Sequence, residues 1–394
     1  MTMLSIDDES KTRDLSAVCF KRTFGNPFFL IEFMKMLQLE GLLDYNLGLM
    51  RWVWDVSKIE DATMSAANVV YLLQAKMMKL SKDAQSLLQY AACLGSSFSL
   101  AALKYVWENH ATLLFEGIDP DLTDILEVVR KENLIEPCDL NQLRWVHDKI
   151  QEAVLSLSDL VTPQFQFGLG ICLYQGLDGQ MLEAQLFNVA DLVNKGKATQ
   201  RSELAELNLR TAKKAHKMAA FQSSAHYIAN GIMQLPSDVW KEHRNLALEL
   251  YSLGAEVNMA LGNIELGKEY IRTVLDRDEY TPMETMRVKM TKMEILGNIE
   301  ARHSDAVDFG VQVLKEIGYK FVWSRNLVSV QALALVGTTV KRLEKVPVDH
   351  FESLSLMKDK RHRAIINLLS KLCVISYTAN DVFFAFICTC KVIE

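Results

Sequence analysis

Glycine and proline are scarce in this sequence, whose 394 residues include 18 glycines and 7 prolines. Both residues bound short strands and form tight turns. Their scarcity therefore argues against a chain of many short strands and favours a mainly α-helical protein. The 17 methionines fit this expectation, because their flexible side chains fill irregular gaps between packed helices.

A strong excess of charge of one sign is also missing. With a net charge of −6, the chain offers no bulk attraction to nucleic acid or to an anionic membrane. No uninterrupted apolar run reaches the about 18 residues of a membrane-spanning helix. The acidic N-terminus lacks the apolar segment of a signal peptide. We therefore expect a cytoplasmic protein without a membrane span.

The cysteines form no pattern that predicts a disulfide framework or a metal site. The seven cysteines are scattered, and an odd number in apolar surroundings favours a reduced, intracellular compartment. Cys388 and Cys390 lie close together, but neither a second pair nor a histidine cluster accompanies them. No metal ligand is therefore assigned.

Signatures of catalysis are absent from the sequence. It contains no Gly-x-x-x-x-Gly-Lys-Ser/Thr phosphate-binding loop (P-loop), and no apolar strand ends in paired acids. A nucleophile elbow, a His-x-x-x-His motif and a kinase catalytic loop are missing too. We assign no catalytic residue and expect no intrinsic enzymatic activity. The basic run 358–363 is either a patch for phosphate or an acidic partner, or a solvated helix face.

The first informative stretch is Thr23–Leu30, in which Gly25, Asn26 and Pro27 precede an apolar pattern of helical spacing. Pro27 disfavours helix at Asn26 and suits the first turn of a helix. The pattern predicts a helix over residues 27–40. Its first N–H groups either belong to an ordinary capped core helix or face a phosphate or a purine edge.

The next part of the chain predicts helices enclosed by two hairpins. Residues 42–54 read as a small hairpin with a glycine-containing turn. Strands at Leu134–Glu136 and Leu143–Val146 form the second hairpin. Between the hairpins, four residues are placed to cap helices, namely Asn68, Ser81, Ser99 and Asp121. Helices followed by a hairpin suggest a winged helix.

His147 and Asp148 follow that second hairpin. Asp148 is placed to cap a helix over residues 149–158. His147 is either a strand-end histidine with local hydrogen bonds or part of a binding site, since an imidazole is suited to contact an anion.

Winged helices often bind DNA, usually through the helix before the wing, which here is the helix before the second hairpin. Only Arg130 and Lys131 supply positive charge on this segment. The acidic residues outnumber them: Asp119, Asp121, Asp124, Glu127 and Glu132. Because phosphate contacts supply most nucleic-acid affinity, the segment favours no nucleic-acid partner.

From residue 198 onward the sequence repeats a pair of helices. Predicted helices over residues 204–218, 246–259 and 286–300 are each followed by a second helix that carries a small residue. The small residues are Ala225, Gly267 and Ala306, at spacings of 42 and 39 residues, looser than a strict tetratricopeptide period. The pattern predicts a short solenoid of tetratricopeptide-like hairpins that binds protein partners; a plain helical bundle is the alternative.

The final apolar stretch, residues 382–387, has no polar capping helix after it. We therefore expect an exposed apolar face that a partner, or a continuation of the natural protein beyond Glu394, covers.

Several of these segments come in an order that resembles the predicted-ATPase module of the STAND class of signalling NTPases, often fused to Ser/Thr or histidine sensor kinases. The resemblance extends from about Thr23 to Gly318. It rests on Gly25–Phe29, Glu40–Leu43, Arg51–Asp55, Asn68–Val70, Ala91–Phe98, Trp145–Ala153 and Ala205–Leu209.

The resemblance implies functional residues as well as a fold. It places Gly25, Asn26 and Pro27 in the sensor corner beside the nucleotide. It makes His147 the counterpart of a histidine that contacts the β-phosphate of ADP in related switches. These four are the candidate cofactor-binding residues, and ATP or ADP is expected only if a P-loop domain lies upstream. The chain would then be the C-terminal portion of such a module.

The expected fold is mainly α, with a remnant of an AAA+ lid region, a winged-helix domain and a tetratricopeptide-like α-solenoid. The expected parts are residues 1–64 with the small hairpin, 65–160 as the winged helix, 161–197 as a helical linker, and 198–394 as the repeats.

Three functions remain open from the sequence. The first is a regulatory segment that relays sensing by the solenoid to a nucleotide switch and a fused or associated kinase. The second is a stand-alone adaptor scaffold without nucleotide dependence. The third is a winged-helix transcription regulator.

Overall fold

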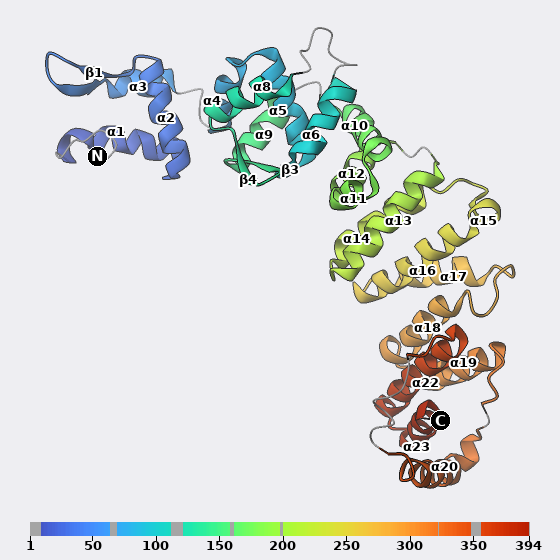
Figure 1. Cartoon of the computed structure of the whole chain (residues 1–394). Helices are drawn as coiled ribbons and strands as arrows, with labels where there is room; N and C mark the ends of the chain where they lie inside the picture. The colour runs from blue at the N-terminus through green and yellow to red at the C-terminus, as the bar shows by residue number, and fades with distance from the viewer. Residues whose placement is uncertain are drawn as a thin grey trace. The chain divides into compact units, whose positions relative to one another are not determined.

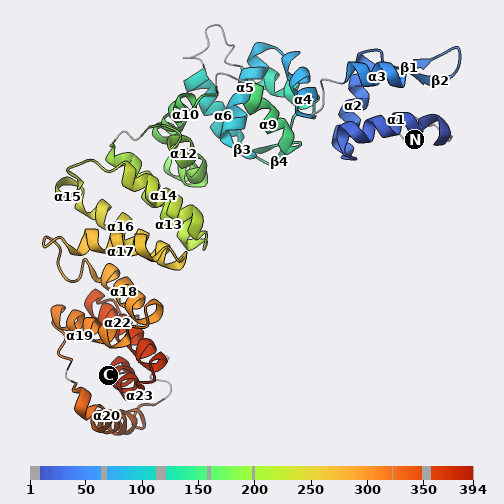
Figure 2. The same cartoon turned by 180° about the vertical axis from the view of Figure 1, so that it is seen from behind.

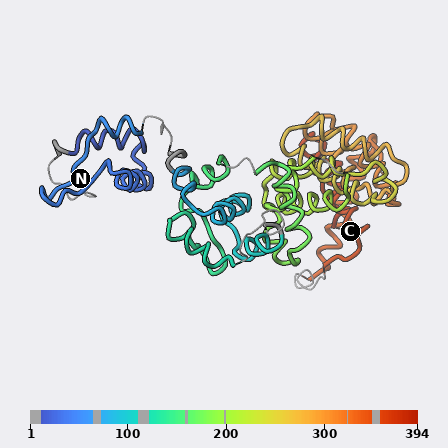
Figure 3. The backbone as a smooth tube through the Cα atoms, turned by 90° about the horizontal axis from the view of Figure 1, so that it is seen from above, coloured from blue at the N-terminus to red at the C-terminus, as the bar shows by residue number. Residues whose placement is uncertain are grey.

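Helices account for most of the chain in the computed structural model, as the scarcity of glycine and proline predicts (Figure 1). The structure describes residues 9–63, 69–111, 121–157, 161–197, 200–321, 323–347 and 356–393. Asn68 and Asp119, which entered the sequence predictions, lie outside these ranges. The chain divides into two compact units, residues 1–197 and 198–394, and the backbone of each can be followed in Figure 3.

The helix predicted after the Gly25-Asn26-Pro27 corner is confirmed as α2 (Pro27–Leu39). Asn26 caps it, because its Oδ1 accepts hydrogen bonds from the N–H groups of Phe28 (3.0 Å) and Phe29 (3.4 Å). The helix buries its apolar face in a small core. That core is shared with α1 (Glu9–Thr23), β1 (Leu43–Asn46) and α3 (Val56–Ala62), and β1 pairs antiparallel with β2 (Arg51–Trp54) in the predicted hairpin.

The following helices and strands surround a three-stranded antiparallel sheet of order β3-β5-β4. They are α4 (Val69–Met78), α5 (Lys82–Leu94), β3 (Ser97–Ser99), α6 (Leu100–Val106), the π-helical turn η2 (Trp107–Ala111), α8 (Leu122–Lys131), β4 (Ile135–Asp139), β5 (Gln142–Trp145) and α9 (Asp148–Leu157). The β4–β5 hairpin was predicted. Strand β3 was not predicted, because three residues directly before a helix cap are too few to show an alternating pattern.

The helix caps predicted for this region are confirmed where the structure describes them. Ser81 accepts a hydrogen bond from the N–H of Ala84 at 3.2 Å, and Ser99 accepts one from Ala102 at 3.4 Å. Asp121 caps α8 through the N–H of Thr123 at 3.0 Å. Each side chain satisfies a backbone donor that the helix itself cannot pair.

Residues 163–193 form three further helices, which pack on α5 and α6. They are α10 (Pro163–Gly176), α11 (Gly179–Ala184) and α12 (Leu186–Val193). Asn188 donates from Nδ2 to the carbonyl oxygen of Leu94 at 2.6 Å. The rings of Tyr90 and Phe165 lie 5.3 Å apart.

The second unit is built from stacked helical hairpins, as predicted for a solenoid. Its helices are α13 (Ser202–Lys217), α14 (Phe221–Met233), α15 (Val239–Glu242), α16 (Arg244–Ala260), α17 (Ile264–Leu275), α18 (Met286–Glu294), the π-helical turn η3 (Ile295–Ile299), α19 (His303–Glu316), the 3-10 turn η4 (Arg325–Leu327), α20 (Val328–Leu343), α22 (Lys360–Thr378) and α23 (Val382–Ile393).

Four of these hairpins share one turn geometry. The middle residue of each turn has a left-handed backbone, with φ between +55° and +79°: Ala219, Gly262, Ala301 and Asn380. The residue five positions later is buried against the first helix in all four hairpins: Ser224, Gly267, Ala306 and Ala385. The prediction of Ala225 as the small residue of the first hairpin is therefore wrong by one position. Ser224 lies there, and its Oγ donates to the carbonyl oxygen of Ala212 at 3.0 Å.

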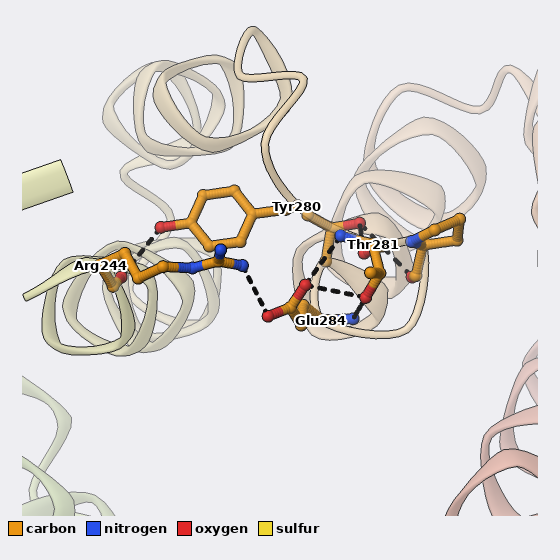
Figure 4. Close-up of polar contacts among 6 residues, drawn as sticks. Arg244, Tyr280, Thr281 and Glu284 are labelled. Atoms are coloured by element: carbon orange, nitrogen blue, oxygen red, sulfur yellow. Dashed lines mark hydrogen bonds and ion pairs between the residues drawn. The ribbon is translucent and has the colours of Figure 1, made fainter. Parts of the chain in front are cut away.

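The loop between α17 and α18 is fixed to α16 by polar contacts (Figure 4). The Arg244 guanidinium donates to Glu284 at 2.7 Å, and the Tyr280 hydroxyl donates to the carbonyl oxygen of Arg244 at 2.9 Å. Glu284 Oε2 also accepts from the N–H and the hydroxyl of Thr281, both at 2.8 Å. Together these contacts hold the long connection in one conformation between two hairpins.

The last apolar stretch is covered in part, so the expectation of an exposed apolar face holds only for part of it. Helix α20 packs on α23, and both Figures 1 and 2 show it at the end of the unit beyond α23. Phe384 and Ile387 are buried there with Ala332 of α20 in one core. Phe383 and Phe386 remain 42% and 48% exposed. The covering helix precedes α22 in the chain, so no local pattern in the sequence predicts it.

Candidate functional site

The corner before α2 has a strained, exposed backbone. Phe24 and Gly25 both have left-handed φ values, +50° and +77°, and the Phe24 side chain is 78% exposed. Gly25 and Pro27 are exposed, and Asn26 is half-buried. The positive φ explains why glycine stands at position 25, since a side chain is disfavoured in that conformation. The corner therefore presents Asn26 at the start of a helix.

His147 lies against the same helix start. Its ring stacks on Phe28, with centroids 5.2 Å apart, and contacts Phe29 at 4.6 Å. Nδ1 of His147 accepts a hydrogen bond from the N–H of Lys149 at 3.1 Å. The cap of α9 is thus made by His147, whereas the prediction gave this role to Asp148. Asp148 is the first residue of the helix instead.

Asn26 and His147, which are 121 residues apart in the sequence, meet in the structure. Asn26 Nδ2 lies 3.5 Å from His147 Nε2. The orientation of the Asn26 amide is set by its cap, because Oδ1 accepts the helix N–H groups. Of the four candidate residues, Asn26 and His147 are brought together. Gly25 and Pro27 shape the corner that presents Asn26 to His147.

The hydrogen bonding of this pair leaves two donors side by side. A neutral imidazole that accepts at Nδ1 carries its proton on Nε2. Nε2–H then faces the Nδ2–H group of Asn26, and neither group accepts from the other. An oxygen placed beside both groups would satisfy both donors. The arrangement is suited to a carboxylate, phosphate or carbonyl oxygen.

A second set of polar contacts joins α2 to α4 and to the turn after α8. Lys76 Nζ donates to Glu32 at 2.9 Å and to the carbonyl oxygen of Glu132 at 2.6 Å. Lys79 pairs with Glu40 at 3.3 Å. These residues line a cleft of about 350 Å³. No sequence signal predicts the set, because the partners are distant and of common types.

The ion pairs set the ionisation of Glu32. Burial raises the pKa of this carboxyl, but the hydrogen bonds and charges of Lys76 and Lys35 outweigh burial, so its pKa lies below the ordinary value. The cysteine thiols show the opposite effect, since burial raises the pKa of Cys19 to about 11 and that of Cys93 to about 12. Such thiols are poor nucleophiles.

The second unit carries an acidic groove near the starts of α13 and α16. It has a volume of about 640 Å³, and its lining contains four glutamates and one arginine: Glu203, Glu206, Glu242, Glu249 and Arg244. Glu249 is paired with Lys213 at 2.9 Å. The sequence predicts that the repeats bind protein partners but names no residues for this role. The groove is a candidate surface for it.

Among the described residues, no group of three or more His, Cys, Asp or Glu side chains could hold a metal ion. Within the same ranges, no helix is both long and apolar enough to cross a bilayer.

Comparisons with known proteins give two similarities. No family model matches the chain. A hybrid signal transduction histidine kinase G from Dictyostelium discoideum is 24% identical over 371 residues. That similarity covers 78% of this chain and 11% of the relative, so the chain spans only about a tenth of the curated protein that it matches.

Among solved structures, the chain is similar to a STAND protein with a tetratricopeptide repeat sensor from Pyrococcus horikoshii. The two share 15% identity with a TM-score of 0.35, over 98% of this chain and 59% of the other. A TM-score of that size carries no argument about this chain.

Proposed function

We propose that the chain is a regulatory and interaction segment of a STAND-like signalling ATPase. The contact between Asn26 and His147 carries this proposal. The residues come from the two places that the resemblance assigns to nucleotide contact, and they present two adjacent donors. Because the two residues come from distant segments, the site is complete only while these segments are in contact.

In this proposal, residues 9–63 are the end of the ATPase lid region and residues 69–157 are a winged helix. The order of elements supports the assignment: helices α4 and α5, strand β3, helices α6 and α8, and the β4–β5 hairpin as the wing. The winged helix moves as a switch element, and its movement separates His147 from the corner. The change is a shift of population between closed and open arrangements.

The nucleotide is supplied by a P-loop domain encoded upstream. An oxygen of the ADP β-phosphate accepts from Asn26 Nδ2–H and His147 Nε2–H and holds the closed state. The donor pair supports this role, because both N–H groups lack a protein acceptor at their point of contact. Charge-assisted hydrogen bonds of this kind contribute about 1.5–3 kcal/mol each.

The second unit is the sensing part, and it binds a protein partner through the acidic groove. Glutamates outnumber the single arginine of this lining, so the groove suits a lysine- or arginine-rich segment, although Glu249 already pairs with Lys213. The relative in Dictyostelium discoideum is a histidine kinase, so we propose a kinase as the output of the switch.

Nucleic acid is not the partner in this proposal. The outer face of α8 exposes Asp121, Asp124 and Glu127, which would repel a phosphate backbone. A transcription regulator is therefore the least supported of the three functions that the sequence left open.

The first test is the intact mass of the native protein in cell extract, with sequencing of the full-length transcript. A mass well above 44.7 kDa, with an upstream P-loop, is the expected result. A mass of 44.7 kDa would favour the second function, a helical adaptor without nucleotide dependence. The acidic groove would then bind its partner without a nucleotide switch.

The role of His147 is tested in the full-length protein by the rate of ADP release. His147→Ala removes one of the two donors and is expected to speed release about tenfold or more. Phe28→Leu, which keeps an apolar side chain beside the ring position, is the control for packing. An unchanged rate in His147→Ala would reject the phosphate contact.

A further inference from the structure

A cavity in the second unit carries unpaired polar atoms that the proposed switch does not use. It has a volume of about 340 Å³ and lies where α19 begins, beside the turn between α22 and α23. Its polar lining includes His303, Arg325, Ser376 and Asp381. Trp323 and Val328 are among its apolar walls. A cavity of this volume is at the small end of ligand sites, which span about 300–1,000 Å³.

Ser376 is a buried polar residue in the lining of this cavity. Its side chain is fully buried, and its Oγ has no hydrogen-bond partner among the described residues. Nδ1 of His303 is buried and unpartnered in the same way. Buried polar atoms are nearly always paired, so such atoms in one cavity call for a ligand or water.

Ser224 shows what a merely structural serine looks like in this solenoid. It is also fully buried, but its Oγ donates to the carbonyl oxygen of Ala212 at 3.0 Å. The two serines therefore differ in hydrogen bonding and not in burial.

Asp381 supplies an unpaired negative charge at one side of the cavity. Its Oδ1 accepts from the N–H of Phe384 at 3.2 Å and caps α23. Its Oδ2 has no partner among the described residues. A carboxylate oxygen in this position is suited to a ligand ammonium group.

The start of α19 supplies donors for a ligand carboxylate. No side chain caps this helix of 14 residues, so the N–H groups of its first turn are left for another acceptor. Arg325 adds little net charge, because Asp308 accepts from its Nη2 through both carboxylate oxygens at 2.7 Å. The helix N–H groups and the Ser376 hydroxyl are therefore the donors.

From these groups we infer that the cavity binds a free α-amino acid with an apolar side chain. The ammonium group pairs with Asp381, the carboxylate accepts from the α19 N–H groups and Ser376, and the side chain lies against Trp323 and Val328. The inference gives the proposed sensing part a small-molecule ligand. Only the role of that ligand in signalling rests on the proposed function. Binding itself is measured on the chain alone, without nucleotide, so the two proposals fail separately.

The test is calorimetric titration of the full chain with L-leucine, 3-methylbutylamine and 4-methylpentanoate. Leucine is expected to bind saturably, and the two analogues, each lacking one charged group, to bind about tenfold or more weakly. Asp381→Asn keeps the helix cap and is expected to weaken leucine binding by about 10- to 100-fold. The other standard L-amino acids, titrated in the same way, define the side-chain preference.

Ser376→Ala separates a ligand role from a structural one. Removing an unpaired hydroxyl is expected to leave the ligand-free chain as stable or more stable, while leucine binding weakens about fivefold or more. Ser224→Ala, the matched control, is expected to lower stability and leave binding unchanged. Failure of every amino acid to bind at millimolar concentration would make the cavity a water site and overturn the inference. Binding that Asp381→Asn and Ser376→Ala both leave unchanged would overturn it too.

Discussion

Two regions of the molecule differ in the contacts that hold their own elements together: residues 9–157 and residues 200–393. Between α2 and the elements that follow it, the joining contacts include the ion pairs of Lys76 and Lys79 and the Asn26–His147 pair. Between α19, α22 and α23 they are a continuous apolar core that includes Leu369, Leu372 and Phe384. Ion pairs near the surface contribute about 0–1 kcal/mol each, whereas each fully buried apolar side chain contributes about 1.5–3 kcal/mol. This difference fits the proposed roles of the two regions, a switch in the first and a sensing part in the second.

The apolar kind of contact predicts the largest effect. Leu372 is fully buried where α22 packs on α19. Leu372→Ala is expected to lower the free energy of unfolding of the second unit by about 2–5 kcal/mol, because it removes contacts and leaves a cavity. Denaturant titration measures the change. Val374→Ala, on the same helix but at a side chain 56% exposed, is the matched control and should change stability by less than about 0.5 kcal/mol.

Equal effects of the two substitutions would show that the last hairpin is not a packed core. The contrast between the two kinds of contact would then be lost.

The hairpins also contain an ion pair, and its geometry sets it apart from those of Lys76 and Lys79. Arg287 of α18 binds Glu256 of α16 through two parallel hydrogen bonds, at 2.7 and 2.6 Å. Glu256→Gln keeps the shape and removes the charge, and is expected to lower stability by about 1–2 kcal/mol. The estimate is modest because both side chains are about a third exposed.

Glu265→Gln is the control for Glu256→Gln. Glu265 pairs with Lys268 of the same helix and is 80% exposed, so its change should be within about 0.5 kcal/mol. Equal losses in the two variants, read from the denaturation midpoint, would contradict a special role for the bidentate pair.

Acid should weaken the contact between α2 and α4 before it affects the hairpin cores. The pKa of Glu32 lies below its ordinary value of about 4.3, so its contribution is complete above that pH and is lost as pH falls through the lower, folded-state pKa. The expected loss is about 1 kcal/mol, followed as hydrogen exchange of residues 27–39 between about pH 6 and pH 3.

In Glu32→Gln the contact is weaker at neutral pH, and this part of the acid dependence disappears. A variant that keeps the full acid dependence would show that another group carries it.

The contrast between the two regions was only partly predictable from sequence. Helix caps such as Ser81 and Ser99, and the helix after Pro27, follow local rules and were predicted. The position of α20 over α23 and the pairing of Lys76 with Glu32 depend on tertiary packing, which no local pattern encodes. The comparison of the repeat segments predicted Ala225 as the small residue at the close approach of two helices. The buried position holds Ser224, whose hydroxyl is satisfied by a backbone carbonyl.

The candidate site shows the same limit. Sequence order and resemblance selected Asn26 and His147 separately, but their contact follows only from the fold. The role of His147 as a cap was missed because Asp148 is the more common capping residue. Here a ring nitrogen of His147 accepts the helix N–H group in place of the usual side-chain oxygen, and no sequence pattern indicates such a cap.

The smallest expected effect tests the donor pair itself. Asn26→Asp keeps the cap of α2, since Asp and Asn cap equally well, and replaces the Nδ2–H group by an oxygen. That oxygen accepts from His147 Nε2–H, so the variant is expected to stabilise the contact by about 0.5 kcal/mol. Nitrogen-detected NMR should show the His147 proton on Nε2 in both proteins.

In the full-length protein, Asn26→Asp should also release ADP faster, because the new carboxylate repels a phosphate. Asn26→Ala is the control, and loss of the cap should destabilise it by about 1 kcal/mol. If Asn26→Asp destabilises as much as Asn26→Ala, the two donors do not face each other, and the polar contact between the corner and His147 is not a site for an anion.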